Sequence, residues 1–120
     1  MLSARLSAPM KLNNRNIILR IVKPYPQARN HVYTGHVVDW DEGFLAIDGC
    51  VLSFGRPSTE DPSGGLTVSQ REVRWVPRER IQYLRELPDE IDPFNAEHFQ
   101  VTTGGKVTHS SNPRPDLLPE

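Results

Sequence analysis

The sequence predicts an all-β fold, a single small closed barrel made of five short and strongly bent strands. Short apolar runs rich in β-branched residues alternate with polar residues at period two, as strands with one buried face do. Glycine stands inside two of these runs, at Gly35 and Gly49, where a curved sheet bends or brings two backbones together. No stretch shows a convincing helical period, and closure would remove the exposed edges of a small sheet.

The first strand is expected at 16–23, in the segment NIILRIVK. Its apolar residues alternate along one face, and these are Ile17, Leu19 and Ile21. Arg20 points to the opposite face of the strand. Pro24 and Pro26 end the strand, because proline has no N–H to donate to a ladder. The connection that follows is longer than a tight hairpin turn.

The second strand is expected at 32–40. Trp40 is out of phase with Val37 on this strand, which indicates a bend or bulge near Asp39. The acidic residues and glycine at 41–43 are a turn signal, so the chain is expected to reverse there.

The remaining strands follow at regular intervals. A long apolar strand is expected at 44–54, followed by a loop at 55–65 that is rich in Gly, Pro and Ser. The fourth strand is expected at 66–76, and a shift in its apolar phase indicates a bend within it. Residues 77–80 are short enough for a single 3₁₀ turn, after which a short fifth strand covers 81–87.

The charge distribution suggests three parts of the chain. Residues 1–13 are expected to be a flexible leader, and residues 14–87 to form the barrel. Residues 88–120 carry 2 basic and 6 acidic residues and contain Pro and Gly, so a mostly disordered acidic tail is expected there. The tail either keeps the protein soluble or competes with an anionic partner for the body, which has 11 basic and 9 acidic residues at 11–87.

No catalytic or metal-binding constellation stands out. The single cysteine, Cys50, excludes an internal disulfide and a cysteine-built zinc site. Asp41, flanked by Asp39 and Glu42, is interpreted as a turn residue whose carboxylate accepts hydrogen bonds from backbone amides. The histidines lack the spacing of zinc ligands, and they are His31, His36, His98 and His109.

These observations favour a protein that is not an enzyme and needs no cofactor or metal. No nucleophile motif, phosphate-cradling glycine loop or dinucleotide fingerprint is found. No apolar run approaches the ~20 residues that a membrane-spanning helix needs, so no membrane association is expected. We therefore expect a cytoplasmic protein.

Two spaced motifs resemble the Sm-like (LSm/Hfq-type) family of small β-barrels. The first motif has Gly35 between apolar strand residues, then Trp40 and Asp41, then the apolar run 44–47. The second is a short basic turn between two apolar residues in WVPRERIQYL, which starts at Trp75. The resemblance covers roughly residues 14–87 and implies a five-stranded SH3-like barrel of Sm type, with Gly35, Trp40 and Asp41 as structural turn residues.

The resemblance also implies a function, namely a non-catalytic, ring-forming protein that binds single-stranded RNA. Its fourth and fifth strands would pair with those of neighbouring copies, and loop residues would gather around a central opening. The residues at the matching positions are Phe44, Leu45, Arg78 and Arg80. Phosphate contacts and base stacking would supply the affinity, which should fall as salt rises.

Other interpretations remain open at this point. Leu45 and Pro77 stand where many relatives carry Asn and Arg, which favours a protein-interaction or structural oligomerisation module without RNA binding. The basic residues alternate with glutamates, as on a solvated or subunit-pairing face, and they are Arg71, Arg74, Arg78, Arg80 and Arg85. Aromatic residues in the strands are expected mainly in the core or at subunit interfaces, namely Tyr33, Trp40, Phe54, Trp75 and Tyr83.

Overall fold

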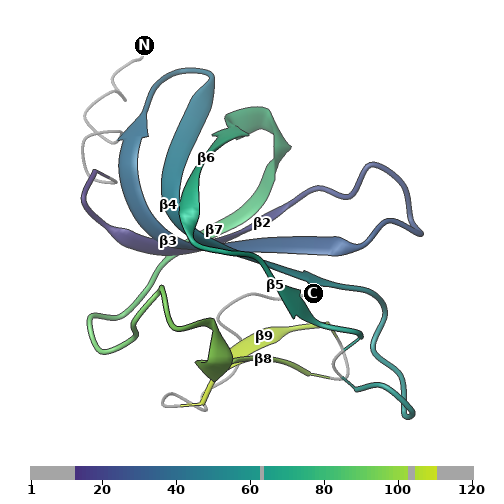
Figure 1. Cartoon of the computed structure of the whole chain (residues 1–120). Coiled ribbons are helices and arrows are strands. Elements are labelled where there is room, and N and C mark those ends of the chain that lie inside the picture. The colour runs from purple at the N-terminus through teal and green to yellow at the C-terminus, as the bar shows by residue number, and fades with distance from the viewer. Residues whose placement is uncertain (1–12, 63, 103–104, 111–120) are drawn as a thin grey trace.

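The computed structural model describes residues 13–62, 64–102 and 105–110, and it is an all-β structure with two short 3₁₀ helices (Figure 1). The elements in chain order are β2 (Asn16–Ile21), β3 (Asn30–Trp40), β4 (Phe44–Phe54), β5 (Thr67–Val68), β6 (Glu72–Pro77), η1 (Arg78–Arg80), β7 (Ile81–Glu86), η2 (Ala96–His98), β8 (Phe99–Val101) and β9 (Val107–His109). The predicted all-β class is confirmed. The predicted fourth strand is divided into β5 and β6, at the place where its apolar phase shifts.

The main sheet is antiparallel and follows the path β7-β2-β3-β4-β6, with β5 as a second partner of β4. The sheet is strongly curved (Figure 1), and the three residues of η1 connect its two end strands, β6 and β7. Closure of the barrel, which the sequence predicted, is not found, because no ladder joins β6 to β7 among the described residues. Each of these strands uses one edge within the chain, β6 with β4 and β7 with β2.

Two glycines allow the backbones of β3 and β4 to approach each other closely. Gly35 and Gly49 are direct cross-strand partners on β3 and β4. A Cβ atom on Gly35 would lie 2.3 Å from the carbonyl oxygen of Asp48, and one on Gly49 would lie 2.0 Å from that of Thr34. No side chain fits at either position, so the predicted role of glycine in a close backbone approach is confirmed.

The predicted bulge in the second strand is also present. Val37 pairs with Ile47 and Asp39 pairs with Ala46, so Val38 is an extra residue on β3. A bulge of this kind increases the local twist and turns the strand. It brings Trp40 back to the inner face, where its ring packs against the core.

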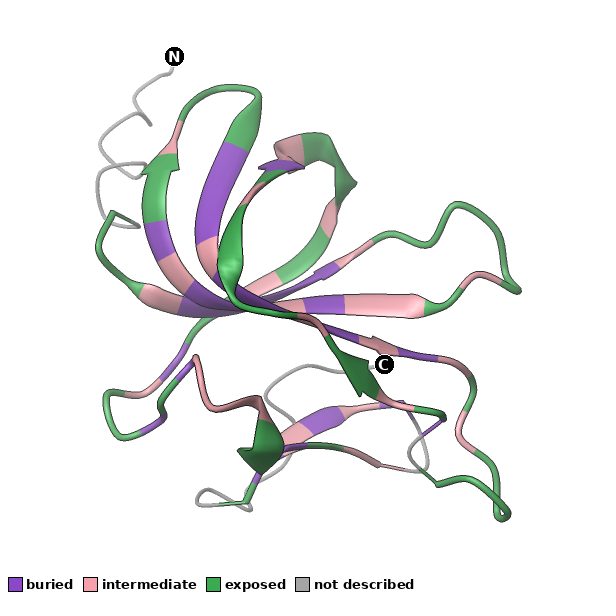
Figure 2. Ribbon diagram, viewed as in Figure 1, coloured by how far each residue is buried: buried purple, intermediate pink, exposed green. Residues whose placement is uncertain are grey.

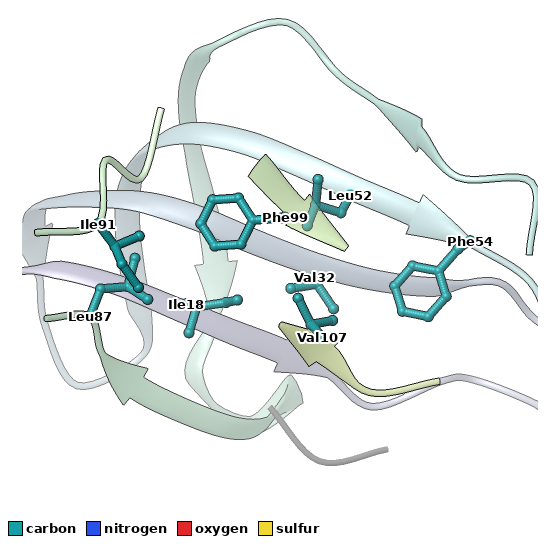
Figure 3. Packing of buried hydrophobic residues seen from close by; sticks show 8 residues of the cluster. All are labelled: Ile18, Val32, Leu52, Phe54, Leu87, Ile91, Phe99 and Val107. Carbon is teal, nitrogen blue, oxygen red and sulfur yellow. The ribbon is translucent and has the colours of Figure 1, made fainter. Parts of the chain in front are cut away.

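The central strands β2, β3 and β4 contribute buried residues to a core on each face of the sheet. The residues of the inner core are Ile17, Leu19, Val37, Leu45, Ile47 and Val76. The residues of the outer core are Ile18, Val32, Leu52, Phe54, Leu87, Ile91, Phe99 and Val107 (Figure 3). The predicted inner face of the first strand is therefore confirmed, and the opposite face of the same strand is buried as well (Figure 2).

The C-terminal segment supplies three of the eight buried residues of the outer core. The expectation of a mostly disordered tail from residue 88 is wrong for 88–102 and 105–110, which contain η2 and the β8–β9 hairpin. Isolated apolar anchors such as Ile91, Phe99 and Val107 dock this segment on the sheet, and their wide spacing leaves no periodic signal in the sequence. The predicted leader at 1–13, except its last residue, and the end of the tail at 111–120 lie outside the described residues.

Arg20 links the two layers from the outer face of β2. Its side chain is buried, and its guanidinium donates one hydrogen bond to Asn30 Oδ1 and one to the Gly105 carbonyl, both at 2.9 Å. The same group lies 5.7 Å from the centre of the Phe54 ring. The fold tolerates this buried charge because the guanidinium is hydrogen-bonded to Asn30 and to a carbonyl of the β8–β9 connection.

Candidate functional site at the two turns

The residues that the sequence singled out meet where the β3–β4 turn contacts η1. Phe44 pairs with Pro77 at the end of the β4–β6 ladder. The backbone N–H of Arg78 donates to the carbonyl of Gly43 at 2.9 Å. Turns that are 35 residues apart in the chain are thereby held side by side, and Phe44, Leu45 and Arg78 are brought together at one end of the sheet.

Asp41 organises the first of these turns. Its Oδ1 atom accepts hydrogen bonds from the backbone N–H groups of Gly43 and Phe44, both at 2.8 Å. The bonds from Phe44 and Gly43 hold the pKa of the Asp41 carboxyl below its ordinary value, and the charge of Arg78 lowers it further. The structural role that the sequence predicted for Asp41 is confirmed.

Arg78 is fixed in position by contacts with Trp40 and Asp41. Its guanidinium carbon lies 4.4 Å from the centre of the Trp40 ring, and its Nη1 donates to the carbonyl of Asp41 at 2.8 Å. A stacked and hydrogen-bonded guanidinium has fewer donors left for a ligand. Arg78 acts first as a brace between the two turns.

A small pocket of about 220 Å³ opens beside this brace. The residues that line it are Trp40, Leu45, Arg78, Ile81 and Leu84. Leu45 is 0% exposed and belongs to the inner core, so it forms only the floor of the pocket. Phe44, in contrast, is 45% exposed, and its ring is available to a ligand. The two residues that the sequence placed in one site therefore differ, because Phe44 faces solvent and Leu45 faces the core.

Two further arginines of the predicted basic set have partners within the chain. Arg71 binds both carboxylate oxygens of Asp48, at 3.1 and 2.9 Å, and its guanidinium carbon lies 3.8 Å from the centre of the Phe94 ring. This hydrogen-bonded pair lowers the pKa of Asp48. Arg74 donates to the carbonyls of Gly49 and Gln70. Arg71 and Arg74 are therefore engaged by partners within the chain.

Arg80 differs from Arg78, Arg71 and Arg74 in its contacts. Its side chain is exposed, and it makes no hydrogen bond or ion pair within the described ranges. It borders an open hollow of about 490 Å³, whose other lining residues are Val22, Lys23, Pro24 and Glu79. The sequence did not indicate this hollow, because Lys23 and Arg80 are far apart in the chain. The pairing of Ile21 with Ile81 and the hydrogen bond from Val22 N–H to the Arg80 carbonyl bring their segments together.

An apolar surface lies on the end strands of the sheet. Trp75 and Val73 point to the outer face of β6 and are 55% and 53% exposed, and Tyr83 on β7 is 41% exposed. The aromatic residues predicted to be in the core or at an interface are thus divided. Phe54 is buried in the outer core, and Tyr33 and Trp40 pack against the inner core, whereas Trp75 and Tyr83 face solvent.

No metal site is found in the part of the chain that the structure describes, where no three His, Cys, Asp or Glu side chains converge. Cys50 is buried, and this burial raises the pKa of its thiol. His109 is also buried, between the rings of His98 and Phe99, and burial lowers its pKa. Among the described residues, no helix has the length and apolar character needed to cross a membrane.

Comparisons with known proteins add no relative. No family model, no curated protein and no solved structure matches this chain. The resemblance to the Sm-like family therefore rests on the two motifs and their spacing.

Proposed function

We propose that the chain is a non-catalytic, self-assembling interaction module of Sm-like type, in which β6 of one copy pairs with β7 of the next. The observation that carries this proposal is the pair of end strands β6 and β7, each of which pairs within the chain along one edge only. An unpaired strand edge presents a row of N–H and C=O groups that favours pairing with another strand.

The geometry of the two edges defines the type of assembly. The two edges belong to different strands at opposite ends of one sheet path, so a contact between them is heterologous. Heterologous contacts generate a ring when the rotation closes and a filament when it does not. A neighbouring strand on each edge would extend the sheet from one copy to the next.

Apolar side chains beside the edges supply a reason for association. Trp75 and Val73 flank one edge, and Tyr83 flanks the other. Pairing β6 with β7 of a second copy would bring these side chains together on the outer face of a continuous sheet. Each 100 Å² of apolar surface removed from water contributes about 2.5 kcal/mol, and aromatic residues are enriched at such interfaces.

A charge placed at this edge tests the proposal. Trp75→Lys or Val73→Lys should disrupt assembly, because a lysine on an edge strand opposes pairing with another strand. Val68→Lys on β5 is the matched control, since Val68 is 45% exposed but lies away from the β6 edge. In size-exclusion chromatography with light scattering, the β6 variants should elute as smaller species and V68K should not. Equal behaviour of all three variants would count against this interface.

Binding of single-stranded RNA is a second candidate function. It is favoured by the exposed ring of Phe44 and by the exposed guanidinium of Arg80 on the adjoining turn. Stacking of a base on an aromatic ring contributes about 1–3 kcal/mol in proteins that bind single strands. Short U-rich and A-rich RNAs at low and moderate salt provide the test, and Phe44→Ala should weaken both complexes. Absence of binding to either RNA would remove this candidate and leave the assembly proposal intact.

A further inference from the structure

The hollow beside η1 combines two cations from distant parts of the chain. Lys23 lies near the start of the connection between β2 and β3, and Arg80 is the last residue of η1. The segments that carry Lys23 and Arg80 are joined by the 2.7 Å hydrogen bond from Val22 N–H to the Arg80 carbonyl. The backbone therefore holds the two sides of the hollow together. Both side chains border the same open volume of about 490 Å³.

The donors of both cations are available to a ligand. The ammonium of Lys23 donates to the carbonyl of Pro26 at 3.2 Å, which uses one of its three N–H groups. The guanidinium of Arg80 has no partner within the described residues, and its planar fork suits phosphate oxygens. Glu79 is the only acidic residue that lines the hollow in the described part of the chain, so the two cations outnumber it.

The same connection presents an aromatic ring. Tyr25, two residues after Lys23, is 59% exposed. Figure 1 shows the β2–β3 connection extending away from the body of the sheet. Cations and exposed aromatic rings on one surface are the combination that binds single-stranded nucleic acids, since phosphates contact the cations and bases stack on the rings.

We propose that Lys23 and Arg80 form a phosphate-binding site for single-stranded RNA in this hollow. The inference rests on the proposed RNA binding and assigns its phosphate contacts to Lys23 and Arg80, while Arg78 braces the turns. Glu79 repels the phosphate and weakens the site. Because the contacts are to the backbone, they add affinity without preference for a base.

Fluorescence anisotropy with labelled U-rich and A-rich RNAs and the full chain tests this site. Lys23→Gln and Arg80→Gln should each weaken binding about two- to fivefold, the range expected for an exposed ion pair. The loss should be equal for both sequences, and the slope of log affinity against log salt should become shallower by about 0.7 for each variant. Glu79→Gln should bind more tightly than the wild type.

Arg56→Gln is the matched control, because Arg56 is an exposed arginine in the loop after β4 and lies outside the hollow. It loses one positive charge and should bind RNA nearly as the wild type does. Light scattering on each variant checks that assembly is unchanged. If RNA binds but K23Q and R80Q match R56Q, the site is wrong while RNA binding stands. If no RNA binds, the RNA-binding candidate and this phosphate site both fall, and the assembly proposal stands. Tighter binding of poly-glutamate than RNA, with the same dependence on Lys23 and Arg80, would also overturn the assignment.

Discussion

At the scale of single residues, backbone geometry explains why particular residue types are needed. Gly35 and Gly49 face each other where β3 and β4 approach most closely, and a Cβ atom on either would overlap a carbonyl oxygen. Asp41 is needed for its carboxylate, which binds two amides of the β3–β4 turn. Both requirements could be predicted from the sequence, because glycine inside a strand and aspartate in a turn have few other structural uses.

Gly35→Ala should destabilise the fold by about 3 kcal/mol, the upper range for forcing extra volume into a packed structure. The physical reason is the carbonyl oxygen of Asp48, which belongs to the backbone and cannot rotate away from a new Cβ. Gly43→Ala is the control, since the nearest atom to its Cβ would lie 3.8 Å away. Urea denaturation compares the two variants, and equal free energies of unfolding would refute the close-approach argument.

Asp41→Asn should make stability less sensitive to acid. The folded-state pKa of Asp41 is lowered, so its carboxylate stabilises the fold above its ordinary pKa, and this stability is lost as pH falls through the lowered value. The wild type should therefore be the more stable protein at neutral pH, and the difference should disappear in acid. Thermal unfolding followed across this pH range measures the difference. A constant gap at all pH values would show that the charge of Asp41 contributes nothing.

At the scale of elements, the C-terminal segment is a second layer that covers the outer face of β2, β3 and β4. Its three-residue strands β8 and β9 are too short for stability on their own. They are held by packing on the sheet and by the contact of Arg20 with the Gly105 carbonyl. The sequence could not predict this layer, because its anchors are separated by polar, Gly- and Pro-containing stretches that resemble a disordered tail.

Phe99→Ala should cost about 3 kcal/mol, at the low end of values for a buried phenylalanine. The ring is buried in the outer core, and its loss would leave a cavity between β8 and the sheet. Gln100→Ala is the control, because Gln100 follows Phe99 on β8 and its side chain is exposed. Proteolysis should cut the C-terminal segment faster in F99A than in Q100A. Equal cleavage rates would mean that the segment does not depend on this anchor.

At the scale of the whole molecule, the described chain is a curved sheet whose central strands are covered on both faces and whose strands β6 and β7 each pair along one edge only. The bulge near Asp39 and the close approach at the two glycines follow from apolar phase and glycine position, and the sequence predicted them. The open gap between β6 and β7 and the exposure of Trp75 were not predictable, since apolar phase does not distinguish a side chain in the core from one at an interface. Likewise, nothing in the sequence indicated that Arg78 stacks on Trp40 while Arg80 remains exposed.

The mass of the wild-type protein in solution tests the central proposal most directly. Sedimentation equilibrium over a wide range of concentrations should give a multiple of the 13.6 kDa chain mass, and Trp75→Lys should lower it toward a single chain. A wild-type mass of 13.6 kDa at every concentration would contradict assembly through the edges of β6 and β7.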